Sequence, residues 1–166
     1  MLKIFKWVIF TVSALLILVQ FVRPARTNPR ADEAVALEAH SRMTPEVSAL
    51  LKRACADCHS NETEWPWYSN VAPASWLVID HVNHGRSHLN FSTWGEYRPA
   101  ERIELLENIC EWVRLGWMPM GSYTLVHSEA RLSEQDKAAI CEWASAERER
   151  LLAGDGRKRE ARPSNN

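Results

Sequence analysis

The sequence predicts a mostly α-helical protein, with one small cytochrome c-like helical domain behind a single N-terminal transmembrane helix. Three observations support this class. A length of 166 residues suits one compact domain with extensions. Apolar side chains recur at helical spacing in several segments, and no series of alternating strand-like segments interrupts them. We therefore expect an anchor and short tether over residues 1–30, a helical domain over 31–152 and a disordered polar tail over 153–166.

The first predicted helix decides the compartment. Residues 7–22 lack charged side chains, and the apolar run over 4–22 has 19 residues if the Lys6 amine extends to the surface. A spanning helix needs about 20 residues, and no small-residue cleavage site follows the run. We expect an uncleaved anchor in the inner, cytoplasmic membrane, with the domain in the periplasm or otherwise outside that membrane. A removed signal peptide is the alternative.

Helix-start signals and apolar faces define the domain. Thr44 before Pro45 is a hydroxyl cap ahead of a first-turn proline, and Ser133 with Asp136 three residues later resembles a capping box. The helices expected from these signals and from apolar periodicity cover residues 32–41, 45–54, 73–84, 99–115 and 134–152. Aromatic-rich loops connect them, so the domain is expected to be helix packed on helix.

Charge is distributed unevenly along the chain. Residues 1–30 carry five basic and no acidic groups, residues 31–147 carry nine basic and 18 acidic groups, and residues 148–166 carry six basic and three acidic groups. The middle segment therefore has a net charge of −9, although the whole chain has a formal net charge of −1. This distribution argues against a nucleic-acid-binding domain and predicts a redox partner protein with a basic docking face.

A cofactor-attachment motif follows the predicted helix 45–54. Cys55, Cys58 and His59 form Cys-x-x-Cys-His, the motif that attaches c-type haem. Two intervening residues let each cysteine sulfur reach one haem vinyl group, and the adjacent histidine can bind the iron as its proximal ligand. The motif predicts one haem c, covalently attached through Cys55 and Cys58, with its iron on His59.

Three other interpretations of the motif are weaker. A thioredoxin-like redox pair needs a preceding strand and a βαβ unit, which the sequence does not show. A zinc site needs a second cysteine or histidine pair at finger spacing, which is also missing. A plain structural disulfide would not need the adjacent His59. Haem attachment is therefore the main hypothesis.

A second iron ligand has to come from elsewhere in the chain. Met118 is the first candidate, because a thioether is a soft ligand that raises the reduction potential. Met120 has the same chemistry and lies two residues later. The histidine alternatives share one stripe of a helix: His81, His84 and His88. An open sixth position is a further alternative, with the methionines as loop or core fillers and the histidine stripe as a solvated face.

Aromatic residues fit a haem pocket as well. Large aromatic side chains can wall a haem and exclude water, although ordinary core packing would use them equally well. The tryptophans near the motif or between it and the methionine loop are Trp65, Trp67, Trp76, Trp94 and Trp117. His40 and His127 are expected to be ordinary surface or capping residues.

Cys110 and Cys141 fall on apolar faces of the predicted helices 99–115 and 134–152. If these helices pack antiparallel, the two sulfurs can meet, and an exported location permits a disulfide. Two buried thiols acting as small hydrophobic groups are the alternative. The choice depends on a Cα separation below about 7 Å, which the sequence does not contain.

The motif and the segments after it resemble a known family. The resemblance covers about residues 40–146 and is carried by residues 55–68, which read Cys-Ala-Asp-Cys-His-Ser-Asn-Glu-Thr-Glu-Trp-Pro-Trp-Tyr, and by parts of 72–77, 88–94 and 118–133. These segments are similar to the bacterial haem-binding-domain family built on Cys-x-x-Cys-His. The resemblance implies a c-type haem domain, which the family carries alone behind an anchor or joined to cytochrome c and di-haem peroxidase domains. This chain has one such motif, so a complete di-haem peroxidase is not expected.

Two functions from different classes follow. The favoured one is a membrane-anchored monohaem c-type cytochrome that transfers electrons at the outer face, with His59 and Met118 on the iron, and that is a carrier rather than an enzyme. The alternative is a haem-based sensor or peroxide-reducing accessory protein, which needs an open or displaceable sixth ligand. Carbon monoxide binding to the ferrous protein distinguishes the two.

Overall fold

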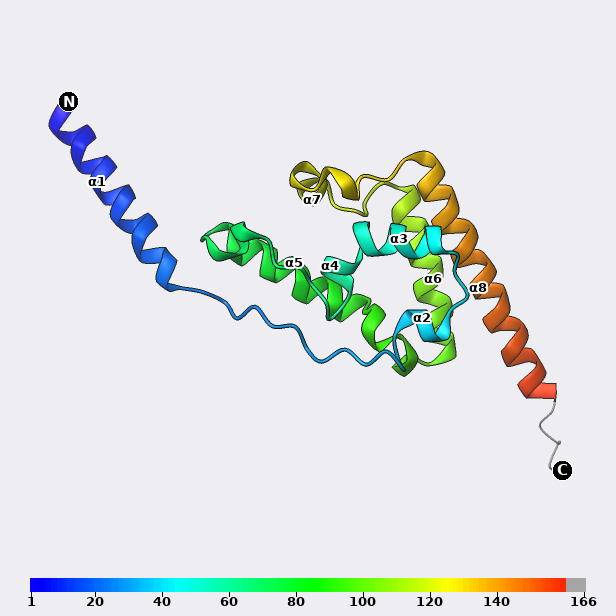
Figure 1. The fold of residues 1–166 in the computed structure, drawn as a ribbon. Helices are drawn as coiled ribbons and strands as arrows, with labels where there is room; N and C mark the ends of the chain where they lie inside the picture. Colours follow the sequence, from blue (N-terminus) through cyan, green and yellow to red (C-terminus); the bar gives the residue numbers. More distant parts are fainter. Residues whose placement is uncertain (161–166) are drawn as a thin grey trace.

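The computed structural model describes residues 1–160, with the side chains of residues 1–154. This part contains helices and no strand, which confirms the predicted mostly α class. Its α-helices are α1 Leu2–Leu18, α2 Leu37–His40, α3 Pro45–Ala54, α4 Ala56–His59, α5 Ala74–His88, α6 Pro99–Arg114, α7 Gly121–Val126 and α8 Glu134–Glu160. Its 3-10 helices are η1 Val19–Phe21, η2 Trp67–Asn70, η3 Phe91–Glu96 and η4 Ser128–Ala130. Figure 1 shows α1 standing apart from a bundle that the remaining helices form.

α1 and η1 form one continuous apolar helix. It covers Leu2–Phe21, has 20 residues and is not buried by the rest of the protein. Its length and composition suffice to cross a membrane, and a signal sequence would meet the same criteria.

The two predicted helix caps are confirmed. The Thr44 hydroxyl accepts a hydrogen bond from the Val47 backbone N–H at 3.2 Å, as an N-cap should. At the start of α8, the Ser133 N–H donates to the Asp136 carboxylate at 2.8 Å, and the Asp136 N–H donates to the Ser133 hydroxyl at 3.1 Å. Both ends are therefore set by local chemistry that the sequence displays.

Several predicted boundaries are wrong. α2 is a single turn instead of a helix over 32–41, and α5 continues past residue 84 to His88. α8 runs to Glu160, beyond the predicted end at 152, so the first part of the expected tail is helical. Extending a helix adds one hydrogen bond per residue and needs no new nucleus, so α8 can continue into a polar segment. The rest of the expected tail, residues 161–166, lies outside the described residues.

The core lies where α3, α6 and α8 pack with the aromatic side chains of η3. α6 and α8 run antiparallel, because a disulfide joins Cys110 to Cys141 while Arg148, further along α8, pairs with Glu107 at 3.5 Å. The Cα atoms of the two cysteines are 4.6 Å apart, within the range that a disulfide requires. The predicted meeting of these two sulfurs is confirmed, and the alternative of two separate buried thiols is wrong.

Candidate functional site

The cysteine–histidine motif forms a single helical turn after α3. The backbone N–H groups of Cys58 and His59 both donate to the Cys55 carbonyl, at 3.1 and 2.9 Å. Cysteines three residues apart on a helical turn project from the same side, and both thiols are free and half-buried. One short element, α4 with its cap, therefore presents two thiols and an imidazole together.

The two thiols are not arranged as a redox-active pair. Burial is the main cause that raises the pKa of Cys55 to about 12 and the pKa of Cys58 to about 11. Reactive dithiols have a lowered pKa instead, which exposes a thiolate at neutral pH. In the described part of the chain no strand precedes the motif. The thioredoxin-like interpretation therefore has no support.

The His59 ring is oriented by its Nδ1 atom. Nδ1 lies 3.1 Å from the Gly85 carbonyl oxygen and 3.0 Å from the Leu89 carbonyl oxygen. A carbonyl can only accept, so Nδ1 carries the proton and Nε2 carries the lone pair. Burial lowers the pKa of His59 and keeps the ring neutral. Histidines that bind metals are held in this way by a partner on the second ring nitrogen.

The contact between α4 and α5 requires glycine at position 85. A Cβ atom on Gly85 would lie 2.5 Å from the Cys58 carbonyl oxygen, closer than real Cβ contacts. By sequence alone, Gly85 is only a weak point in a helix. In the fold it lets α5 approach α4 closely enough for its own carbonyl to reach His59.

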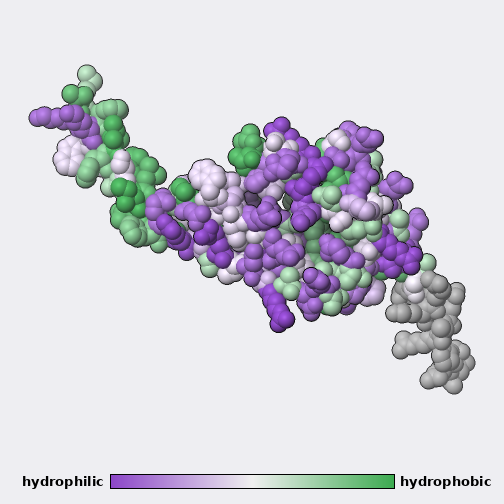
Figure 2. Space-filling model, in the orientation of Figure 1, coloured by the Kyte–Doolittle hydropathy of each residue, from purple (hydrophilic) through white to green (hydrophobic). Residues whose placement is uncertain are grey.

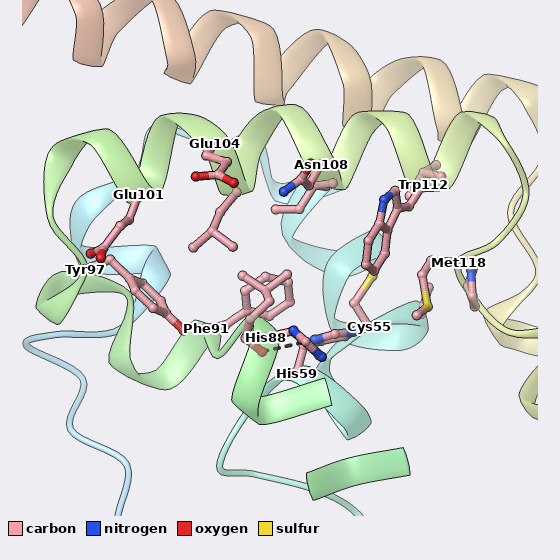
Figure 3. A pocket seen from close by; sticks show the side chains of 16 residues that line it. Cys55, His59, His88, Phe91, Tyr97, Glu101, Glu104, Asn108, Trp112 and Met118 are labelled. Carbon is pink, nitrogen blue, oxygen red and sulfur yellow. Dashed lines mark hydrogen bonds between the residues drawn. The ribbon is translucent and has the colours of Figure 1, made fainter. Parts of the chain in front are cut away.

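An apolar cavity of about 500 Å³ separates α4 from α6. Figure 3 shows Cys55 and His59 on one side of it, and the α6 side chains Asn108 and Trp112 on the other, with Met118 beyond Trp112. An adjoining space of about 120 Å³ extends toward α5 and α7. Cofactor sites enclose roughly 300–1,000 Å³, so this space can take a large apolar group.

Most of the predicted ligands meet at this cavity. Met118 lines both spaces together with Cys55 and His59, whereas Cys58 and Met120 line only the smaller one. The three histidines of the predicted stripe all line the smaller space: His81, His84 and His88. His88 also lines the larger one. Met118 therefore has the better position of the two methionines.

The five tryptophans considered as haem walls or as core residues do not wall this cavity. None of the five predicted tryptophans lines either space; Trp94 is buried in the core and Trp67 is exposed. The aromatic lining comes instead from Phe91, Tyr97 and Trp112 in the larger space, and from Trp112 and Tyr123 in the smaller one. Cavity-lining residues of α6 recur at positions 101, 104, 108 and 112, so helical periodicity places Trp112 on one face with them, but it does not show that this face lines a cavity.

A polar network supports the motif. The Tyr123 hydroxyl donates to Asp57 Oδ2 at 2.7 Å, and the Glu64 N–H donates to Asp57 Oδ1 at 3.0 Å. The Tyr123 ring stacks on His127 at 4.3 Å between centroids, and the Tyr68 hydroxyl lies 2.7 Å from His127 Nε2. Burial raises the pKa of both tyrosines, so both hydroxyls stay protonated. His127 is therefore part of this network rather than an ordinary surface residue.

Arg86 connects the loop after the motif to the segment after α1. Its guanidinium donates to the Ser60 carbonyl and the Thr63 hydroxyl, both at 2.7 Å. It also donates to the Thr27 carbonyl at 2.7 Å and to Asn28 Oδ1 at 2.8 Å. Sequence reasoning missed Arg86 because its partners lie 23 to 59 residues away in the chain. The expected short tether is therefore hydrogen-bonded to the domain.

The donor set does not suit a bare metal ion. Within residues 1–154, no three His, Cys, Asp or Glu side chains gather as a metal site, so the zinc alternative has no support. The cavity instead offers one imidazole nitrogen, two thiols and a thioether around an apolar space. Such a set suits a large apolar group that brings its own metal and needs only axial ligands.

Comparison with known proteins bears directly on this cavity. A family model described as a haem-binding domain matches residues 14–146, which include the motif and the residues that line the cavity. No curated protein and no solved structure matches the chain.

Proposed function

Because this chain belongs to the haem-binding-domain family, we propose that it is a membrane-anchored monohaem c-type cytochrome that transfers electrons. One observation carries the proposal: His59 lines an apolar cavity while two carbonyls hold its Nδ1, which leaves Nε2 as the nitrogen that can bind iron. Cys55 and Met118 line the same cavity. The residues present therefore fit a haem c group.

Each residue has a defined role in this proposal. Cys55 and Cys58 attach the group covalently, His59 is the proximal ligand and Met118 is the distal ligand. When bound, haem c supplies an iron centre that changes between the ferrous and ferric states. The apolar side chains of the cavity, among them Trp112, exclude water, which is one means by which a protein sets the reduction potential.

Two features support a location outside the cytoplasm. The apolar helix α1–η1 is long enough to anchor the domain in the inner membrane. The disulfide between Cys110 and Cys141 is typical of an oxidising compartment such as the periplasm. In this proposal the domain works at the outer face of that membrane.

The acidic domain is proposed to dock a basic redox partner. Residues 31–147 carry nine basic and 18 acidic groups, so encounter with a positively charged surface is accelerated at low ionic strength. The rate of reduction by such a partner should fall as salt is added. A rate that does not depend on salt would contradict this docking mode.

The proposal is tested with spectra of the membrane-extracted protein, oxidised and reduced, together with a pyridine haemochrome assay. We expect one haem c per chain and the red charge-transfer band of methionine-ligated ferric haem. Met118→Ala should abolish this band, lower the reduction potential and open the iron to carbon monoxide. Met120→Ala is the matched control and should keep all three properties.

Three outcomes would change the assignment. If Met120→Ala abolishes the band while Met118→Ala does not, Met120 is the distal ligand. If the unaltered ferric protein lacks the band and a histidine variant, His84→Ala or His88→Ala, opens the iron to carbon monoxide, a histidine is the distal ligand. If the unaltered ferrous protein binds carbon monoxide rapidly, the sixth position is open or displaceable. The protein would then be the haem-based sensor or peroxide-reducing accessory protein considered above.

A further inference from the structure

The chain that leaves α1 is attached to one end of the domain. The Gln20 side chain forms two hydrogen bonds with Ala72, one to its carbonyl and one from its N–H, each at 3.0 Å. The Trp76 indole donates to the Val22 carbonyl at 2.7 Å. These contacts hold η2 and the start of α5 at the end of the apolar helix.

The same end of the domain exposes apolar side chains. Trp67 of η2 is 77% exposed and Leu77 of α5 is 54% exposed. α7 lies beside η2, because the Tyr68 hydroxyl contacts His127, the residue after α7, at 2.7 Å. We name this surface the α1-side face, made of the exposed residues Trp67, Val71, Leu77, Leu125 and Val126. Figure 2 shows hydrophobic atoms over α7, on the side of the domain toward α1.

The segment that joins α1 to this face is basic, unlike the acidic domain as a whole. Residues 20–30 carry three basic groups, Arg23, Arg26 and Arg30, and no acidic group. Arg26 also donates to the Ser69 hydroxyl of η2 at 3.2 Å, which keeps this charge beside the face. Basic segments next to a membrane helix are attracted to anionic lipid headgroups. The acidic remainder of the domain is repelled by the same headgroups.

We propose that the α1-side face lies on the lipid headgroup region of the membrane that α1 spans, which rests on the proposed anchoring. Exposed apolar clusters mark contact surfaces, and tryptophan favours the membrane–water interface. Because the segment after α1 is bound to η2 and α5, the face stays where the helix leaves the bilayer. The domain therefore has one orientation on the membrane and does not swing on a free tether.

The test uses the full-length reduced holoprotein in nanodiscs of phosphatidylethanolamine and phosphatidylglycerol. The protein carries 5-fluorotryptophan, and the discs are prepared with and without a lipid whose headgroup bears a gadolinium chelate. Single Trp→Phe variants assign the fluorine signals. We expect the chelate to remove most of the signal intensity of Trp7 and Trp67. It should leave that of Trp143, because relaxation by the chelate falls steeply with distance and α8, which carries Trp143, lies on the side of the domain away from α1 (Figure 1).

A matched pair of surface variants sharpens the test. Leu77→Asp should restore the Trp67 signal, because it puts a charge on the α1-side face. Leu152→Asp alters a position on α8 that is 47% exposed and should change nothing. If the chelate affects Trp7 but affects Trp67 no more than Trp143, the orientation is wrong and the anchor stands. If Trp7 is also unaffected, α1 is not in the bilayer and both the orientation and the proposed anchoring are overturned.

Discussion

The two walls of the cavity are built in different ways. The α6 wall packs on α8, with Leu106, Ile109 and Val113 buried and a disulfide between the two helices. The α4 wall is one short helix without a fully buried residue. It is held by hydrogen bonds, from Nδ1 of His59 to two carbonyls and from Tyr123 to the Asp57 carboxylate.

The α4 wall is therefore the part of the domain whose stability depends on a bound ligand. A four-residue helix cannot offset the cost of helix nucleation by itself, and apolar burial against a partner normally supplies the difference. The α6 wall has that burial within the protein, whereas the α4 wall faces the cavity. A group that binds only the folded state stabilises the fold, so haem should matter most for α4 and α5.

Removing the haem attachment should have the largest effect, and it should destabilise the α4 wall but not the α6 wall. Cys55→Ser combined with Cys58→Ser should abolish covalent haem and leave the cavity without its attached group. Amide hydrogen exchange should then become fast in α4 and α5, while α6 and α8 stay protected. Mass spectrometry measures both properties. Equal protection of the two walls would contradict the comparison, and a folded double variant that retains zinc would contradict the haem assignment itself.

Removing the disulfide should act on the opposite wall. Cys110→Ala combined with Cys141→Ala should lower the free energy of unfolding by about 3.7 kcal/mol, because the bond closes a loop between residues 31 apart. Covalent haem should remain, since neither residue belongs to the motif. Urea unfolding measures the loss. Alkylation of the denatured holoprotein without reductant checks the premise: two added alkyl groups would show that the bond is absent.

Gly85→Ala probes the close contact that positions His59. The new Cβ would meet the Cys58 carbonyl oxygen, so α5 must move and the stability should fall by about 2 kcal/mol. The Gly85 carbonyl moves with the helix, so the haem spectrum should change as well. Gly154→Ala is the control, since no atom lies near its Cβ and alanine should stabilise α8 by about 0.5–1 kcal/mol. If Gly85→Ala changes neither the stability nor the haem spectrum, α5 can move away from Cys58 without cost.

The smallest expected effect is at the start of α8. Asp136→Asn should cost about 1 kcal/mol, because the carboxylate caps the helix through Ser133 and pairs with Arg53 at 3.0 Å. The Ser133 backbone N–H, with further help from the Ser133 hydroxyl and Arg53, holds the pKa of Asp136 below its usual value. The unfolded state therefore takes up the proton first as the pH falls.

The sign of the pH effect follows from that lowered pKa. The stabilisation is complete above the ordinary aspartate pKa of about 3.9 and disappears as the pH falls through the folded-state value. The free energy of unfolding, measured with urea for the unaltered protein and for Asp136→Asn, should converge to the same value at acid pH. A difference in the free energy of unfolding that does not change with pH would mean that the carboxylate charge contributes nothing to stability.

Features that depend on neighbouring residues can be predicted from the sequence. The caps at Thr44 and Ser133, the motif at the end of α3 and the apolar faces of α6 and α8 all follow from signals within one or two turns. These local signals suffice for the fold class, for the two thiols and imidazole of the site, and for the possibility of the Cys110–Cys141 bond. The proposal of Met118 as a ligand came from the chemistry of its thioether and not from a local structural signal.

The contacts between groups far apart in the chain depend on how the helices pack, and local sequence signals do not contain them. The carbonyls that orient His59 come from 26 and 30 residues later, and Arg86 reaches the segment after α1 across 59 residues. A helical period tells which side chains share a face, but it does not tell how the helix is rotated in the bundle. Trp112 of α6 lines the cavity and Trp94 of η3 fills the core, although the residue type is the same. Packing sets that rotation, because burying one face of each helix against the others determines which faces remain for the cavity.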